Sequence, residues 1–186
     1  MRSHIQLLVA LALLASILAP ERALPQHLSR PHARVYVDSC LPTSEFQLHG
    51  VSLTSLSSVA IEGLGKALRV TTDSGEDDGG RYEVQTFHYR DLELEDVRGF
   101  VDRLATRSPG VATPSGLRPG LTLQALRQVL LSQGVHLTEP ADTVVIASCL
   151  SSEGSEPGIL PFEGIIVLTF DRAGHMASLV VAGQRP

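Results

Sequence analysis

The chain has 186 residues, of which 43% are hydrophobic and 19% charged, and its mean hydropathy is slightly positive at +0.13. This apolar content is enough to build a packed core, and it excludes intrinsic disorder for most of the chain. The formal net charge of -5, the two cysteines and the lack of tryptophan exclude a basic nucleic-acid binder and a disulfide-dense mini-protein. None of these values indicates a class of enzyme.

Residues 1–23 have the anatomy of a signal peptide, in which a short basic start precedes an apolar run. The run extends over Ile5–Leu18, a proline interrupts it, and small residues place cleavage after Ala19 or Ala23. It is too short to span a bilayer comfortably, and a membrane anchor or a buried first helix is the alternative interpretation. We therefore expect a periplasmic or secreted protein.

Cys40 and Cys149 are the only cysteines of the sequence. In an exported chain an even pair favours one disulfide, and two unpaired buried thiols are the alternative. Neither cysteine lies at the predicted cleavage point, where a bacterial lipoprotein carries its lipid, so we expect no stable membrane anchor after cleavage. Neither has a CxxC partner or a histidine close by in sequence, which argues against a metal site.

Stretches rich in proline, glycine and serine divide the remaining chain into parts. We expect, in chain order, an extended N-terminal lead (24–48), a first module (49–107), a Pro/Gly-rich linker (108–119) and a second module (120–186). Within the first module, turn-forming residues and carboxylates predict a loop over Asp73–Gly80.

Each expected module begins with a short amphipathic helix, because leucine and alanine recur there at helical spacing. A hydroxyl residue before the helix is suited to be its N-cap, and a glycine after it suits a left-handed C-terminal position. The two helices are expected over 53–64 and 123–130, with Ser52 and Thr122 as N-caps and with Gly65 and Gly134 at their ends.

Strands follow each helix, because aromatic, β-branched and alternating residues dominate there. They are expected over 82–89, 92–95 and 100–104 in the first module and over 143–147, 165–170 and 177–181 in the second. Asp96–Gly99 and Asp171–Gly174 are matched hairpin turns, each with an aspartate at the start and a glycine at the end. The repeated order predicts an α+β fold of two tandem modules, each a short helix packed on a three- to four-stranded antiparallel meander.

The repeated unit resembles the α+β module shared by the SmpA/OmlA (BamE-type) outer-membrane lipoproteins and the β-lactamase inhibitor proteins. The stretch Gly120–Leu126 is similar to the family's Gly-Met-Thr-x-x-x-Val helix start, and Val167–Met176 is similar to its closing Phe-Asp-x-x-Gly hairpin. A tandem arrangement over residues 50–183 is closer to the inhibitor proteins, which carry two such modules. The resemblance implies the fold and a binding role, and it assigns no binding residue.

Sequence signatures of hydrolases are missing: the chain has no Gly-x-Ser-x-Gly, no His-Glu-x-x-His and no Ser-x-x-Lys motif. A triad assembled from distant serines and histidines is the remaining enzymatic alternative. We expect His88, in a strand, and His175, at a hairpin tip, to be surface residues. We therefore expect no catalytic residue, no metal and no cofactor.

The one dense group of carboxylates consists of Asp73, Glu76, Asp77 and Asp78. It does not fit a calcium-binding EF-hand loop, because Asp78 stands where glycine is needed and Val84 stands where a glutamate would bind. A solvated hairpin is one interpretation of this group. The other is an electrostatic contact for a basic partner, because acidic protruding loops steer association.

Three arginines, Arg103, Arg107 and Arg118, flank the proline-rich linker. They have no aromatic neighbours, which a nucleic-acid site would need, so we expect ordinary surface residues and no nucleic-acid partner.

A sheet surface that binds another macromolecule needs only the elements found above, whereas an enzyme needs a pocket with perturbed polar groups. The sequence therefore predicts an exported, non-catalytic protein-binding module whose partner is another exported or envelope protein, such as the target of an inhibitor or immunity-type protein. The alternatives are a cell-envelope assembly accessory protein and a hydrolase that uses scattered serine and histidine residues.

Overall fold

The computed structural model describes residues 34–37, 39–53, 55–77, 79–137, 142–149 and 164–183. All of them belong to the unit His32–Pro186. The predicted signal peptide, residues 1–23, lies outside the described residues.

Ten strands and two α-helices make up the described fold. The strands are β1 (Arg34–Tyr36), β2 (Gln47–Leu48), β3 (Val51–Ser52), β4 (Arg69–Asp77), β5 (Gly80–His88), β6 (Glu93–Val97), β7 (Phe100–Thr106), β8 (Thr143–Ala147), β9 (Gly164–Phe170) and β10 (Met176–Gly183). The helices are α2 (Ser57–Leu64) and α3 (Leu123–Ser132), and a short 3-10 helix, η1 (Thr43–Glu45), precedes β2. The α+β class predicted from the sequence is thereby confirmed.

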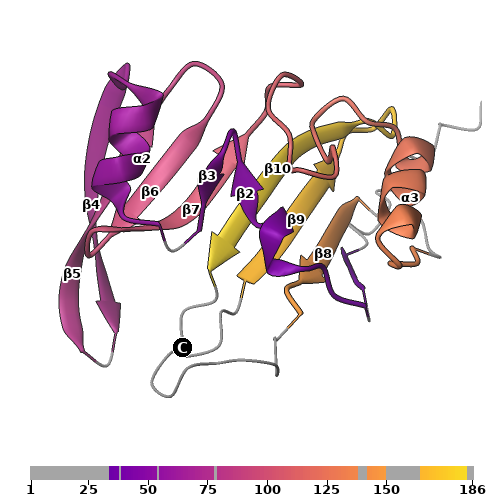
Figure 1. Cartoon of the computed structure of the whole chain (residues 1–186), viewed down its shortest axis with the longest axis horizontal. Helices are drawn as coiled ribbons and strands as arrows, with labels where there is room; N and C mark the ends of the chain where they lie inside the picture. Colours follow the sequence, from indigo (N-terminus) through magenta and orange to yellow (C-terminus); the bar gives the residue numbers. More distant parts are fainter. Residues whose placement is uncertain are drawn as a thin grey trace, which may run out of the picture. The chain divides into compact units, whose positions relative to one another are not determined.

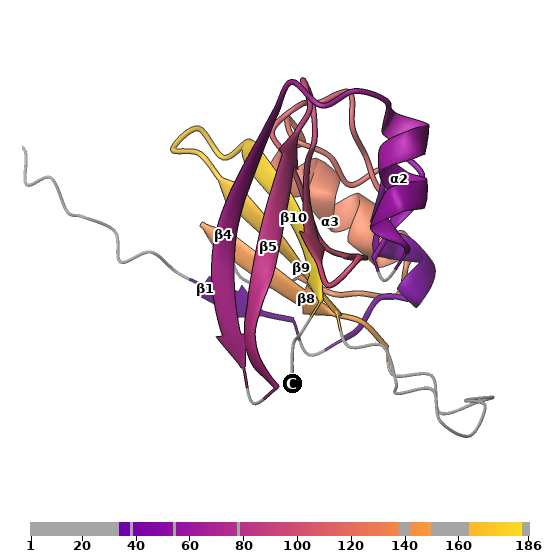
Figure 2. The same cartoon turned by 90° about the vertical axis from the view of Figure 1, so that its left-hand side faces the viewer.

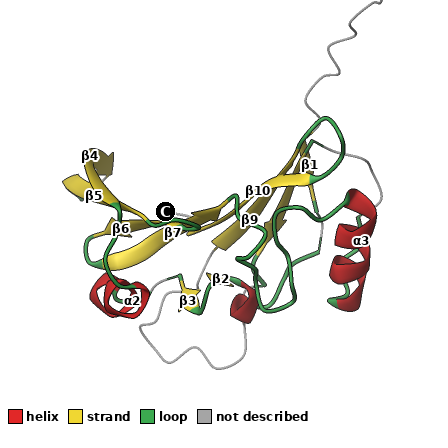
Figure 3. Ribbon diagram, turned by 90° about the horizontal axis from the view of Figure 1, so that it is seen from above, coloured by secondary structure: helices red, strands yellow, loops and turns green. Residues whose placement is uncertain are grey.

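Eight of the strands form one mixed sheet in the order β1-β8-β9-β10-β7-β6-β5-β4, and β2 and β3 form a separate hairpin (Figure 1). Only β1 and β8 run parallel, and every other neighbouring pair is antiparallel. Both helices and the β2–β3 hairpin lie on the same face of the large sheet (Figure 3).

The face of the sheet beneath the helices carries the core, and we call it the covered face. Leu94, Leu104, Leu168 and Leu179 point to it from four strands, and all four are fully buried. Successive side chains of a strand alternate between the two faces, so residues such as Glu93, Ala105 and Val180 lie on the other face, which we call the open face.

The two expected modules are not separate in the structure, because their strands share this one sheet. The meander β4–β7 meets the meander β8–β10 where β7 pairs with β10, from Leu179 opposite Thr106 to Ala182 opposite Arg103. At this junction Leu104, Leu179 and Val181 are fully buried on the covered face, and an unpaired apolar edge there would be exposed to water and to other chains. Pairing of the two meanders removes both edges at once.

The Pro/Gly-rich segment 108–119, predicted as a linker, packs against the core. Val111 and Leu117 are buried among the core residues. The backbone N–H of Ser115 donates a hydrogen bond of 3.1 Å to Glu45, whose side chain is also buried. This contact joins η1 to a segment seventy residues further along the chain, and no local pattern in the sequence indicates it.

The second predicted helix is confirmed together with its cap. The hydroxyl of Thr122 accepts a hydrogen bond of 3.2 Å from the backbone N–H of Ala125, which is the expected N-cap contact. Gly134 follows the helix with a φ of +76°, in the left-handed region.

The first predicted helix exists, but its predicted start and cap are wrong. Ser52 lies in β3, and α2 begins only at Ser57. The chain before it turns back through His49 and Gly50, which both have positive φ, and so forms the β2–β3 hairpin. Two-residue turns with positive φ at both positions favour hairpins, and this turn keeps Ser52 out of the helix.

Both predicted hairpin turns are confirmed. A carboxylate oxygen of Asp96 accepts the backbone N–H of Gly99 at 2.8 Å. In the second turn, Asp171 accepts the backbone N–H groups of Ala173 and His175, both at 2.9 Å. An aspartate that binds backbone N–H groups in this way fixes the turn and the strand register.

Cys40 and Cys149 form a disulfide, with an S–S distance of 2.03 Å, so the alternative of two free thiols is wrong. The bond adjoins the parallel pairing of β1 with β8. Leu41 donates to Ala147 at 2.9 Å, and its carbonyl accepts the N–H of Cys149 at 2.8 Å. A disulfide is typical of proteins in an oxidising compartment. In the described ranges, no helix has the length and apolar character needed to cross a membrane.

Candidate functional site

The β4–β5 hairpin forms one end of the large sheet, and in Figure 2 it faces the viewer. β4 is the last strand in the order, so no other described strand pairs with its outer side. Nine consecutive residues pair with β5, from Arg69 opposite His88 to Asp77 opposite Gly80. The opposite edge strand, β1, has only three residues. β4 is therefore the longer of the two sheet edges.

The predicted acidic loop over Asp73–Gly80 is wrong in its extent, because β4 continues to Asp77 and β5 begins at Gly80. The polar sequence of this stretch does not predict a strand. Pairing with β5 nevertheless supplies the backbone hydrogen bonds of one. Asp73 and Glu76 are both exposed, and the alternation of side chains along a strand puts them on opposite faces of the hairpin.

For two of the four predicted interaction residues the structure describes no side chain. Asp78 lies outside the described residues, and only the backbone of Asp77 is described. The carboxylate of Asp73 accepts the backbone N–H of Ser74 at 2.8 Å. The role of this group in binding stays a prediction.

In the outer half of the β4–β5 hairpin, a glycine and an aromatic ring pack against each other across the two strands. Gly75 lies opposite Tyr82, and a Cβ atom added to Gly75 would overlap the Tyr82 ring. The ring therefore lies directly against the glycine backbone. The guanidinium carbon of Arg98 is 4.8 Å from the centroid of the same ring, which is a cation–π contact. A glycine that can face an aromatic residue across a hairpin is a strand signal, and the prediction of a loop overlooked it.

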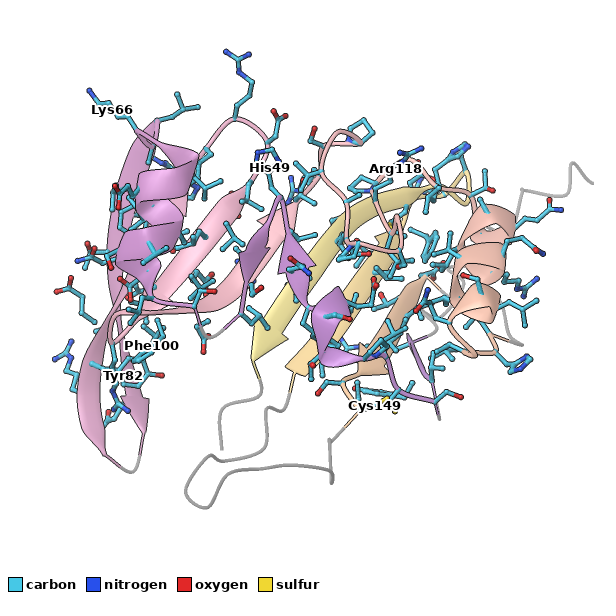
Figure 4. All side chains as sticks on the ribbon, viewed as in Figure 1. His49, Lys66, Tyr82, Phe100, Arg118 and Cys149 are labelled. Carbon is cyan, nitrogen blue, oxygen red and sulfur yellow. A yellow bond between two sulfur atoms is a disulfide. The ribbon has the colours of Figure 1, made fainter. Side chains whose placement is uncertain are left out.

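The turn between β6 and β7 brings an exposed aromatic residue to the same part of the molecule (Figure 4). Phe100 follows the turn and is 49% exposed. Its register partner is Val97, whose own partner on β5 is Val84. Apolar side chains thus continue along the open face from the β4–β5 hairpin to β7.

His88 links three strands on the open face. Its Nδ1 atom is 3.2 Å from a carboxylate oxygen of Glu93, and its Nε2 atom is 3.3 Å from Arg69 and 3.1 Å from the hydroxyl of Thr71. Because arginine can only donate, Nε2 accepts, and the ring proton on Nδ1 is donated to Glu93. The expected surface histidine is in fact half-buried, and its contacts join β4 to β6.

His175 lies exposed at the β9–β10 turn, as expected, and its ring is 4.0 Å from the carboxylate of Asp171. Among the residues that the structure describes, no three His, Cys, Asp or Glu side chains are grouped so that they could hold a metal ion.

Three comparisons, with protein-family models, with curated proteins and with solved structures, find no match for this chain. The resemblance to the SmpA/OmlA and β-lactamase inhibitor module therefore stays a prediction.

Proposed function

We propose that the protein is an exported, non-catalytic protein-binding module, and that it binds a basic, extended segment of another exported or envelope protein along β4. The observation that supports this function best is the position of β4, a nine-residue strand at the edge of an eight-stranded sheet. An exposed sheet edge offers a row of backbone N–H and C=O groups, to which an extended partner segment can add as a further strand.

The side chains along this edge define the chemistry of the partner. Towards the outer end of β4 the exposed carboxylates of Asp73 and Glu76 favour lysine or arginine side chains. Near its start, Leu68 is 75% exposed and Val70 is 49% exposed, and both can contact apolar side chains. We therefore expect the bound segment to be basic at one end and apolar at the other.

The compartment of this function is also part of the proposal. The disulfide between Cys40 and Cys149 and the predicted signal peptide together support a periplasmic or secreted location. A binding partner would then be another exported or envelope protein, and blocking such a partner is the role of an inhibitor or immunity-type protein.

The test uses the disulfide-bonded mature protein and a synthetic extended peptide that carries alternating lysines and a valine-rich end. Binding is measured by fluorescence anisotropy, and the backbone amides that respond are mapped by NMR. We expect the amides of β4 to shift and the affinity to fall with salt. We expect Glu76→Lys to weaken binding, and the matched control Glu62→Lys, which reverses an exposed glutamate of α2, to leave it unchanged.

Two outcomes would contradict the proposal. Equal losses in Glu76→Lys and Glu62→Lys would show that the peptide senses only the overall charge. Binding without a response of the β4 amides would mean that the carboxylates only prevent unwanted edge pairing, which is a known use of charge on edge strands.

A further inference from the structure

A cavity of about 510 Å³ lies on the open face of the sheet, where β6, β7 and β10 adjoin. Glu93 is opposite Ala105, and Ala105 is opposite Val180, so these three lining residues form one row across the face. The chain between β5 and β6 forms one wall. The volume is within the range of small-molecule sites, which is about 300 to 1,000 Å³.

The lining of the cavity includes a small residue, Ala105, between two long ones, Arg103 and Arg107. Arg103, Ala105 and Arg107 are alternate residues of one chain segment, and all three line the cavity. Ala105 is buried, and with the half-buried Val180 it gives the cavity an apolar floor. The two arginines lie two residues before and two residues after Ala105 in the sequence. From the sequence, both were expected to be ordinary surface residues.

Among the described residues, two of the three arginines that line the cavity have no ion-pair partner. Arg103 forms an ion pair of 2.7 Å with Glu95. Glu93 also lines the cavity, and its carboxylate accepts the Nδ1 proton of His88 at 3.2 Å. Arg90 and Arg107 are exposed, and within the described part of the chain neither makes an ion pair.

The other charged residues of the lining are the carboxylates Asp91 and Glu93, and in the described part of the chain neither forms an ion pair with Arg90 or Arg107. The guanidinium groups of Arg90 and Arg107 therefore remain available to a ligand, next to the apolar floor.

The wall that carries Arg90 is held in place by hydrogen bonds. The hydroxyl of Thr106 donates to the carbonyl of Asp91 at 2.6 Å and accepts the N–H of Ser108 at 3.0 Å. The N–H of Tyr89 donates to the carbonyl of Leu92 at 2.8 Å. These bonds fix the chain between β5 and β6 against the end of β7, so the cavity is formed before any ligand arrives.

We propose that this cavity binds a small oxyanion, the carboxylate or phosphate group of a ligand with a short apolar body. The guanidinium groups of Arg90 and Arg107 bind the oxyanion by charge-assisted hydrogen bonds, to which arginine is well suited. The apolar body lies against Ala105 and Val180. The site lies on a face of the sheet and not at its β4 edge, so it can be present or missing independently of the function proposed above.

NMR titration of the disulfide-bonded mature protein tests the site, with sodium phosphate and sodium butyrate as probes at constant ionic strength. We expect saturable shifts at the amides of Arg90, Arg107 and Val180. Arg107→Gln should weaken binding about tenfold or more, the usual effect of losing a hydrogen bond to a charged group. Arg172→Gln removes an equal charge from the exposed β9–β10 turn and should change nothing.

A second variant tests whether the apolar floor contributes to binding. Ala105→Leu fills the apolar floor and leaves every charge in place, so it should block butyrate, which has an apolar body, and spare phosphate. Unchanged binding of butyrate by Ala105→Leu would contradict the placement of its apolar body against Ala105. Shifts that do not saturate with either probe, or equal effects of Arg107→Gln and Arg172→Gln, would overturn the proposal.

Discussion

The eight-stranded sheet has two edge strands, and they are held by different means. β1 is three residues long and parallel to β8, and the disulfide between Cys40 and Cys149 lies just beyond it. β4 is nine residues long and antiparallel to β5, and it has no covalent tie. Side-chain contacts hold it instead, at His88 near its start and at Tyr82 near its outer end.

This difference shows how a long edge can stay ordered while its outer side stays accessible. The contacts of His88 and Tyr82 act from within the hairpin, on the side of β4 that is already paired. A covalent tie at the short edge stabilises the whole fold and leaves β4 unchanged. We therefore expect perturbations of the two edges to be separable.

The largest effect is expected from loss of the disulfide. In the double variant Cys40→Ser with Cys149→Ser, the unfolded chain regains the freedom of a loop with a sequence separation of 109 residues. The chain-entropy model assigns about 4 to 5 kcal/mol to a loop of that length. Chemical denaturation followed by circular dichroism measures this change. Hydrogen exchange should speed up first in β1 and β8, and equally fast loss of protection in β4 would contradict the separation of the edges.

The next largest effect is expected from Gly75→Ala. The added methyl group would overlap the Tyr82 ring, so the ring must leave its place against the backbone and its contact with Arg98. Overpacking of this kind costs about 1 to 3 kcal/mol.

Gly63→Ala is the matched control, because the same change in α2 meets no atom within 4 Å. Alanine favours a helix over glycine by up to about 1 kcal/mol, so this variant should be slightly stabilised. Denaturation midpoints of both variants measure the difference. Equal stability of the two would show that Tyr82 does not lie against Gly75 in solution.

A smaller effect is expected from His88→Ala. The variant loses the contacts to Glu93, Arg69 and Thr71 that join β4 to β6. The loss should cost about 1 to 2 kcal/mol, since partly exposed hydrogen bonds contribute modestly. His175→Ala, at the exposed β9–β10 turn, should change stability by less than about 0.5 kcal/mol. Faster amide exchange in β4 but not in β8 would show that the effect is local, and a uniform change would argue against it.

Features that depend on neighbouring residues were predictable from the sequence. Thr122 caps α3, and Asp96 and Asp171 close their turns, because each side chain reaches a backbone N–H within four residues. The strand predicted over 143–147 is β8. Here the local chemistry is sufficient to specify the structure.

Features that depend on distant residues were not predictable. The outer half of β4 has the sequence of a turn, and it is a strand because β5 pairs with it and Tyr82 covers Gly75. The joining of the two meanders depends on pairing between Arg103 and Ala182, far apart in the chain. The candidate cavity has the same origin, since Arg90 and Arg107 line one cavity only after β5, β6 and β7 have paired.

The smallest expected effect concerns Tyr89, which lines that cavity and lies next to β5. Its hydroxyl oxygen is buried, and it has no hydrogen-bond partner among the described residues. Replacing it in Tyr89→Phe removes an unsatisfied polar group, so the free energy of unfolding near neutral pH should be unchanged or raised by up to about 1 kcal/mol. A clear loss of stability would mean that the hydroxyl has a partner in solution.

The same variant gives a pH test with a definite sign. Burial raises the pKa of Tyr89 above its ordinary value of 10.0, because the charged phenolate loses its hydration. Above pH 10 the unfolded chain releases this proton before the folded protein does, so the contribution of Tyr89 to stability is complete below pH 10 and is lost as the pH rises further. The free energy of unfolding of the wild type should therefore fall more steeply above pH 10 than that of Tyr89→Phe. Parallel pH profiles would show that the ring is hydrated, and the wall of the cavity would then be more open than the hydrogen bonds of Thr106 and Ser108 indicate.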